Sequence, residues 1–173
     1  IRSALAAMHT RIMDWFFSPT SANGIGLMRV AWALTVLIFF GLRLGDVVYL
    51  YSDAGLLPGD LGHLVFRGSH RYTLFAYITD PSSVLVVYGV FLAVVTCCLV
   101  GIWTRATTVA AVLLLFSFHE RNLLPLGGGD TVLRLVGFIL MIAPGIQAFS
   151  LDRAWEQWQQ WQQARTLLPA LTM

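Results

Sequence analysis

The stretch from Val84 to Trp103 reads VLVVYGVFLAVVTCCLVGIW, twenty residues without a single charged side chain. An α-helix rises about 1.5 Å per residue, so a helix of this length covers about 30 Å, the thickness of the hydrocarbon layer of a bilayer. Uninterrupted apolar runs of this length are typical of transmembrane helices. This stretch therefore predicts a membrane-spanning helix and with it the fold class.

The composition of the whole chain points the same way. Hydrophobic residues make up 57% of the 173 residues and charged residues only 12%, whereas soluble domains carry about 25% charged residues. The length fits one domain. The net charge is +2 and no block of basic residues resembles a nucleic-acid footprint, so no nucleic-acid partner is predicted.

Further apolar segments on both sides of this stretch complete a bundle of about four transmembrane helices. The predicted spans are residues 25–44, 84–103, 106–122 and 131–149. In the third span the apolar run is only thirteen residues, about 20 Å as a helix. Either Arg105 snorkels at one end, or the helix continues to Asn122 at membrane depth with its polar residues facing protein. Pro144 is expected to kink the fourth span.

Amphipathic helices are predicted at both ends of the chain. Residues 1–17 repeat apolar side chains at helical spacing, and residues 153–166 place Trp155, Trp158 and Trp161 three apart, opposite glutamines. A Trp-rich stripe suits the headgroup layer, where it would anchor the chain to the bilayer. The alternative is a soluble helix that binds a partner protein. The predicted fold is a single all-α integral membrane domain over residues 1–173, and we expect it to be part of a longer protein.

The distribution of arginines predicts the orientation. With the N-terminus inside, the inner side holds five arginines (Arg2, Arg11, Arg105, Arg153 and Arg165) and the outer side three (Arg67, Arg71 and Arg121). Basic residues favour the cytoplasmic side, so we expect a cytoplasmic N-terminus. The long loop between the first two spans and the segment HERN (residues 119–122) would then share the outer face.

Polar residues at the ends of the third and fourth spans form the candidate site. A charge at the centre of a bilayer costs about 2.5–3.5 kcal/mol, so charged residues that remain there are usually paired. The spacing of Asp130 and Arg134 puts both on one helix face. Glu120 is expected to pair with Arg29 or Arg134, and Arg121 with Asp130; the full set of ligand or ion-network candidates is Arg29, Arg121, Asn122, Asp130 and Arg134.

Three glycines precede this fourth span, Gly127, Gly128 and Gly129. They are expected to allow a tight backbone turn with free N–H groups, a helix start that favours anionic or carbonyl ligands, with Asp130 as a cap. His119 and Glu120 are the candidate acid–base groups, since histidine titrates near neutrality. Two interpretations stay open: a buried ion network that joins the helices, which we favour, or a ligand or catalytic site. No metal site is predicted, because the adjacent Cys97 and Cys98 have no second pair.

Several of these segments together resemble a known family. RNLLPLGGGDTVLR (residues 121–134) and APGIQAFSLDR (residues 143–153) resemble the HTTM family, the transmembrane module shared by bacterial membrane proteins and the vitamin K-dependent gamma-carboxylases. Further similar motifs precede these two in the order of the family, so that the resemblance covers nearly the whole chain. They are Arg29, YSDAGLLP (residues 51–58), TDP (residues 79–81) and GIWTR (residues 101–105).

The resemblance implies a multi-pass helical protein of the bacterial inner membrane. In the carboxylases of this family a reduced quinone is oxygenated, and a lysine near the position of HERN is implicated as the initiating base. This chain contains no lysine, and arginine does not deprotonate in proteins.

We therefore expect a non-catalytic structural or accessory subunit that packs against other membrane subunits. The alternative is a quinone- or lipid-linked redox or carboxylase-like enzyme, with its polar site at the outer end of the third and fourth spans and a quinone as the cofactor. A transporter is disfavoured because no pair of interrupted helices occurs in corresponding halves.

Overall fold

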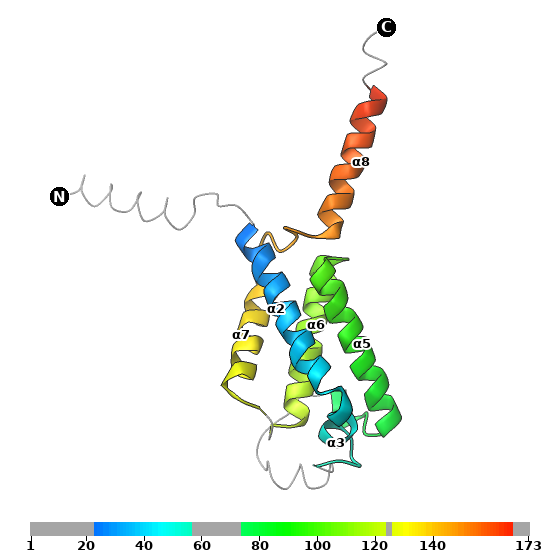
Figure 1. Cartoon of the computed structure of the whole chain (residues 1–173), viewed down its shortest axis with the longest axis vertical. Helices are drawn as coiled ribbons and strands as arrows, with labels where there is room; N and C mark the ends of the chain where they lie inside the picture. The colour runs from blue at the N-terminus through cyan, green and yellow to red at the C-terminus, as the bar shows by residue number, and fades with distance from the viewer. Residues whose placement is uncertain (1–22, 57–73, 124–125, 168–173) are drawn as a thin grey trace, which may run out of the picture.

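The computed structural model describes residues 23–56, 74–123 and 126–167, and every regular element in these ranges is helical (Figure 1). The all-α prediction is confirmed for this part of the chain. The helix predicted over residues 1–17, with Arg2 and Arg11, lies outside the described residues, as do Arg67 and Arg71.

Four long helices form an antiparallel bundle: α2 (Asn23–Leu42), α5 (Pro81–Val100), α6 (Thr104–Arg121) and α7 (Gly128–Ile142). α2 contacts α5 and α7, and α6 contacts the same two helices, so the four close into a ring (Figure 1). The connections from α5 to α6 and from α6 to α7 are short, which favours antiparallel neighbours, whereas a long segment that includes α3 (Val47–Tyr51) and η2 (Leu74–Ala76) joins α2 to α5. We refer to the end where α6 stops and α7 starts as the HERN end, and to the opposite end, from which α8 (Leu151–Leu167) leaves, as the α8 end.

Local signals explain where α5 begins and ends. The Asp80 carboxylate accepts hydrogen bonds from the backbone N–H groups of Ser82 and Ser83, and Pro81 occupies the first turn, where its missing N–H costs nothing. Gly101 closes the helix in a left-handed conformation with φ +82°, which glycine adopts without strain. The helix thus lies three residues earlier than the predicted span 84–103.

The fourth helix is shorter than predicted. The span expected over residues 131–149 ends at Ile142, and turns follow up to Ser150. Pro144 terminates the helix instead of kinking it, because proline disfavours the helical conformation in the residue before it. Ala143 is accordingly extended, with ψ 132°. α7 therefore has 15 residues.

Two of the described helices are long and apolar enough to cross a membrane, α2 with a mean hydropathy of 2.0 and α5 with 2.6. Large apolar side chains on the outside of the bundle are exposed, among them Leu27, Leu34, Ile38 and Leu42 of α2, Val86 and Val90 of α5, and Val132, Leu135, Phe138 and Ile142 of α7. Soluble monomers rarely expose apolar surface on this scale. The four-span bundle predicted from the sequence is thus supported for two helices, α2 and α5.

The core of the bundle is aromatic toward the HERN end. Phe118 of α6 is fully buried and its ring lies 4.7–5.9 Å from five others, those of Phe40, Tyr51, Phe75, Tyr88 and Phe91. Tyr51 comes from the short helix α3 (Val47–Tyr51) and Phe75 from η2 (Leu74–Ala76). This ring cluster fixes the segments after α2 and before α5 against the bundle.

α8 extends beyond the end of the bundle rather than crossing it (Figure 1). Trp155, Trp158 and Trp161 of this helix are all exposed. A helix that lies flat in the headgroup layer would run across the bundle end, so anchoring through this tryptophan stripe stays a prediction. α2 ends at Leu42, so Arg43 follows it at the HERN end. The predicted orientation depends partly on arginines outside the described residues and stays a prediction.

Candidate functional site

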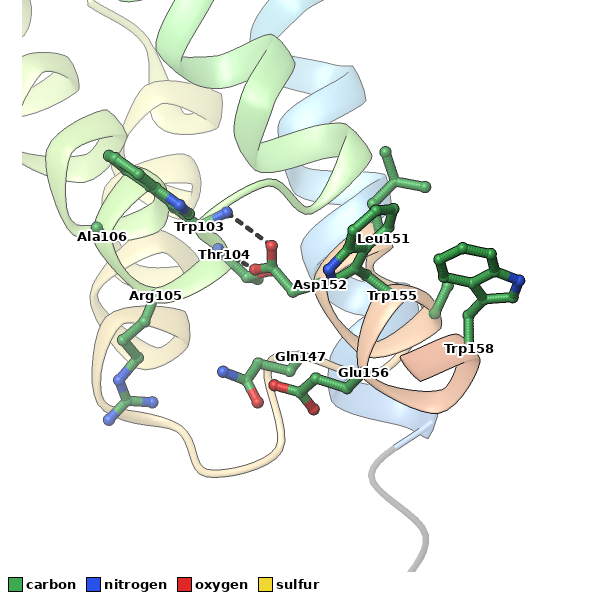
Figure 2. A pocket seen from close by; sticks show the side chains of 11 residues that line it. Trp103, Thr104, Arg105, Ala106, Gln147, Leu151, Asp152, Trp155, Glu156 and Trp158 are labelled. Carbon is green, nitrogen blue, oxygen red and sulfur yellow. Dashed lines mark hydrogen bonds between the residues drawn. The ribbon is translucent and has the colours of Figure 1, made fainter. Parts of the chain in front are cut away.

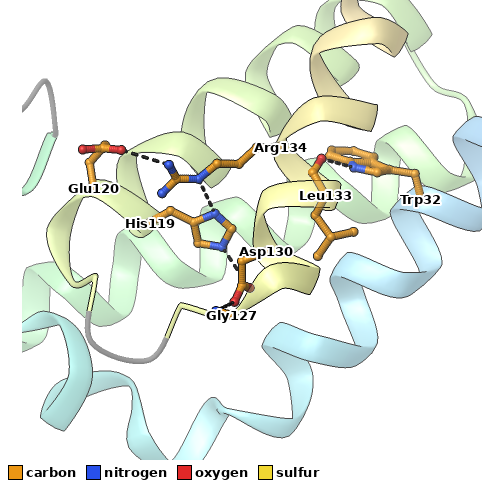
Figure 3. A network of polar contacts seen from close by, with 7 residues as sticks. All are labelled: Trp32, His119, Glu120, Gly127, Asp130, Leu133 and Arg134. Atoms are coloured by element: carbon orange, nitrogen blue, oxygen red, sulfur yellow. Dashed lines mark hydrogen bonds and ion pairs between the residues drawn. The ribbon is translucent and has the colours of Figure 1, made fainter.

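The HERN end holds a polar group that we call the His119 cluster, made of His119, Glu120, Asp130 and Arg134 (Figure 3). Arg134 Nε of α7 donates a hydrogen bond to His119 Nδ1 of α6 at 2.9 Å, and Arg134 Nη1 donates to Glu120 Oε1 at 3.0 Å. One guanidinium therefore joins two consecutive residues of the neighbouring helix. Of the two arginines expected to pair with Glu120, Arg134 is the one that does.

The hydrogen bond from Arg134 determines the protonation of His119. Because Nδ1 accepts, the imidazole is neutral and its proton sits on Nε2. That nitrogen lies 3.5 Å from Asp130 Oδ1, too far for a strong hydrogen bond. The His119 side chain is 1% exposed, so its ring is held between a guanidinium and a carboxylate away from bulk water.

Asp130 caps the start of α7, as the sequence predicts. Its Oδ2 accepts from the Gly127 N–H at 2.8 Å. Gly127 has an extended backbone, with φ −119°, while Gly128 and Gly129 are the first two residues of the helix. A methyl group on Gly128 or Gly129 would meet nothing within 4 Å. The tight turn expected from the three glycines is therefore not what the backbone forms here.

Arg121 and Asn122 turn to the other side and hold the segment after α2. Arg121 Nε donates to the Tyr51 carbonyl at 3.0 Å, and its guanidinium forms an ion pair with Asp53. Asn122 Nδ2 donates to the Leu50 carbonyl at 2.9 Å. The predicted pairing of Arg121 with Asp130 is wrong, because successive residues of a helix point in different directions. Sequence reasoning missed Asp53, because it lies 68 residues before its partner Arg121.

Arg29 lies at the α8 end, far from the cluster that the sequence assigned it to. Its Nη1 donates to Thr104 Oγ1 at 3.5 Å, and its Nη2 donates to the carbonyls of Ala148 and Phe149 at 3.5 and 3.0 Å. Arg29 is fully buried. The prediction that it pairs with Glu120 is wrong, since α2 starts at the end of the bundle where α6 also starts. Arg29 instead ties α2 to the turn after α7.

Asp152, a residue that the sequence did not single out, completes this second cluster. Its Oδ1 accepts from the Trp103 N–H at 3.0 Å, and its Oδ2 accepts from the N–H and hydroxyl of Thr104 at 2.7 and 2.8 Å. A carboxylate from the start of α8 thus caps the N-terminus of α6, in place of the usual cap from the same helix. The motifs GIWTR and SLDR meet here, together with Arg29.

The pKa of Asp152 reflects this capping. Burial raises the pKa of the carboxyl, but hydrogen bonds from Thr104 and Trp103, with Arg29 nearby, outweigh that effect and leave the pKa below its ordinary value of 3.8. The charged form is favoured in the folded protein, so Asp152 stabilises the fold above the pKa of the unfolded chain. That contribution is lost as the pH falls below 3.8 and through the folded pKa.

Acid should therefore destabilise the wild-type protein more than the Asp152→Asn variant. The test measures the thermal midpoint in detergent from about pH 6 down to about pH 3, so that it crosses the range in which carboxyl groups of the unfolded chain take up protons. The exposed Asp46, at the HERN end, provides the matched control Asp46→Asn. The capping role is contradicted if Asp152→Asn and Asp46→Asn leave the same pH dependence.

Gly101 should not tolerate a side chain. Its φ of +82° strains any other residue, and an added Cβ would lie 2.4 Å from Ser150 Cβ and 2.7 Å from Arg29 Nη1. Gly101→Ala should lower the free energy of unfolding by about 1–2 kcal/mol or more from the left-handed backbone alone. Gly89→Ala in the same helix, where nothing lies within 4 Å, is the control and should be neutral or stabilising. Equal stability of the two variants in detergent would contradict this close approach.

Within the described ranges, no group of three or more His, Cys, Asp or Glu side chains is arranged to hold a metal ion. Over the described residues, the fold and the two clusters define an all-α bundle with two candidate membrane-spanning helices, ion pairs at the HERN end and a hydrogen-bonded polar cluster at the α8 end. Comparisons of the chain with protein families, with curated proteins and with solved structures give no match.

Proposed function

We propose that this chain is a multi-pass protein of the bacterial inner membrane, a non-catalytic structural or accessory subunit of a membrane complex, and a member of the HTTM family. The observation that carries the proposal is the double contact of Arg134 with His119 and Glu120. The charges at the HERN end are used to join α6 to α7, and Arg121 uses its charge to hold the segment after α2. Because these side chains are bonded to one another, they are better suited to holding helices together than to reacting with a substrate.

The exposed apolar sides of α2, α5 and α7 support a lipid environment and contacts with other membrane subunits. The landmarks of the family resemblance also gather in two places: HERN, YSDAGL (residues 51–56) and GGGD around the HERN end, and Arg29, GIWTR and SLDR around the α8 end. The residues that carry the family resemblance thus connect the helices at the HERN end and at the α8 end of the bundle.

Alanine at His119 or Glu120 separates a joining role from catalysis. If these residues join the helices, His119→Ala and Glu120→Ala should reduce the yield of folded protein in the membrane and lower its thermal midpoint. Asp46→Ala, at an exposed position of the same end of the bundle, is the control and should leave both unchanged. Fully folded, equally stable His119 and Glu120 variants would contradict the proposal and favour a catalytic role.

A second experiment tests the subunit role itself. The tagged chain would be extracted from native membranes in mild detergent, and native mass spectrometry would measure the mass and stoichiometry of what is recovered. Recovery in fixed stoichiometry with other membrane proteins is the expected result. A monodisperse single chain from freshly solubilised membranes would contradict it.

A quinone- or lipid-linked enzyme is the second candidate, favoured by one observation. An apolar groove of about 680 Å³ runs between α5 and α6, lined by Leu74, Val90, Val94, Ala110, Leu113, Leu114 and Ser117. Its apolar lining suits a prenyl or acyl chain. Organic extraction of the purified protein tests this candidate: a stoichiometric quinone lost in a Leu113→Trp variant would support it over the structural role.

A further inference from the structure

A cavity of about 790 Å³ opens at the α8 end, between the start of α6 and the start of α8 (Figure 2). The proposed joining role does not use it. Its apolar side chains include the indoles of Trp103, Trp155 and Trp158, and its polar side chains are Thr104, Arg105, Gln147, Asp152 and Glu156.

Opposite charges stand on the two sides of this cavity. Arg105 comes from α6, and its Nη1 donates to the Ala143 carbonyl at 2.8 Å. This bond fixes one edge of the guanidinium and leaves its other donors able to bind an anion. Asp152 and Glu156 come from α8, four residues apart and therefore on one face of the helix. The cavity offers a cation on one wall and carboxylates on the other.

The indoles add a surface for a cation. The rings of Trp155 and Trp158 lie 5.3 Å apart, and both are exposed. Trp103 is 78% exposed and has a φ of +46°, a conformation that bulky residues rarely adopt. Aromatic faces attract ammonium groups within about 6 Å, most strongly in the case of tryptophan. Tryptophan is also the side chain most suited to the headgroup level of a bilayer.

We propose that this cavity binds the headgroup of a zwitterionic phospholipid with a primary ammonium, such as phosphatidylethanolamine. The phosphate lies against Arg105, and the ammonium lies toward Glu156 and the indoles. A primary ammonium donates up to three hydrogen bonds to carboxylate oxygens, which a quaternary ammonium cannot do. An anionic headgroup without an ammonium would be repelled by the carboxylates of Asp152 and Glu156. The inference rests on the membrane location in the proposed function.

The test titrates short-chain phosphatidylethanolamine, phosphatidylcholine and phosphatidylglycerol into the detergent-solubilised full chain, with native mass spectrometry as the readout. We expect phosphatidylethanolamine to bind about tenfold more tightly than phosphatidylglycerol, because only phosphatidylethanolamine has an ammonium group that can contact Glu156 and the indoles. Glu156→Gln should remove this preference, and Arg105→Gln should weaken all three lipids. The charge-matched controls Arg153→Gln and Asp46→Asn change residues that do not line the cavity and should behave as wild type.

Two outcomes separate this inference from the proposed function. If carbonate washing releases the chain from membranes, the proposed membrane location fails. If the chain stays in the membrane but the three lipids bind equally, or the Arg105 and Glu156 variants match their controls, the headgroup site alone is overturned. A benzophenone amino acid in place of Trp158 should cross-link to lipid in native membranes. A protein adduct in its place would overturn the lipid assignment.

Discussion

Replacement of Arg134 by methionine should lower the free energy of unfolding by about 3 kcal/mol, the lower end of the range for breaking a buried ion pair. Methionine keeps most of the side-chain length but removes the donors to His119 Nδ1 and Glu120 Oε1. Glu120 is 28% exposed, which limits the loss, but the His119 side chain is 1% exposed and its Nδ1 is left without a hydrogen-bond donor. Unfolding in detergent micelles, followed by circular dichroism, measures the change.

The double variant Arg134→Met with Glu120→Gln isolates the ion pair. Because the carboxylate is then neutral, part of the lost stability should return. Arg165→Met on α8 is the matched control. Its guanidinium stacks over Trp161 outside the bundle, so it should change the stability by no more than about 0.5 kcal/mol. If Arg134→Met is as mild as Arg165→Met, the His119 cluster does not join the helices.

Phe118→Ala should cost about 3–5 kcal/mol of folding stability, the usual range for an aromatic side chain removed from a core. Phe118 is fully buried and its ring contacts come from α2, α3, η2 and α5. The cavity left behind would loosen the segment around Tyr51 as well as the bundle. The thermal midpoint in detergent should fall accordingly, and near-ultraviolet circular dichroism should lose its aromatic signal.

Leu113→Ala provides the control in the same helix. Leu113 is 59% exposed on the outside of the bundle, where detergent or lipid fills the space of a removed side chain. Its replacement should therefore change the midpoint far less than Phe118→Ala. Similar losses for the two variants would show that the aromatic cluster is not the core of the fold.

The helices were predictable from the sequence because long apolar runs leave little choice. The predicted spans 25–44, 84–103 and 106–122 each lie within three residues of α2, α5 and α6. The end of α7 was predicted seven residues too late, since the apolar run continues to Phe149 while the backbone stops at Ile142. At this point Pro144 ends the helix although the apolar run continues. The sequence does contain this information, because the residue before a proline is disfavoured in a helix.

The polar contacts were predictable only where they are local or follow from topology. Asp130 as a cap and Arg134 as the partner of Glu120 depend on spacing and on helices adjacent in sequence. The place of Arg29 was also within reach, because alternating spans put the start of the first and the end of the third at opposite ends of the bundle. Asp53 and Asp152 depend on how turns fold back, and no local pattern determines that.

Asp152 is bonded in both directions: its N–H donates to the Gly101 carbonyl at 3.1 Å, while its carboxylate accepts from the first residues of α6. Three and four residues earlier, the carbonyls of Phe149 and Ala148 accept hydrogen bonds from Arg29 of α2. Hydrogen bonds thus connect the start of α8 to three helices, α2, α5 and α6. A force applied to the far end of α8 would therefore be transmitted to α5 and α6, because the connection at the start of α8 is rigid.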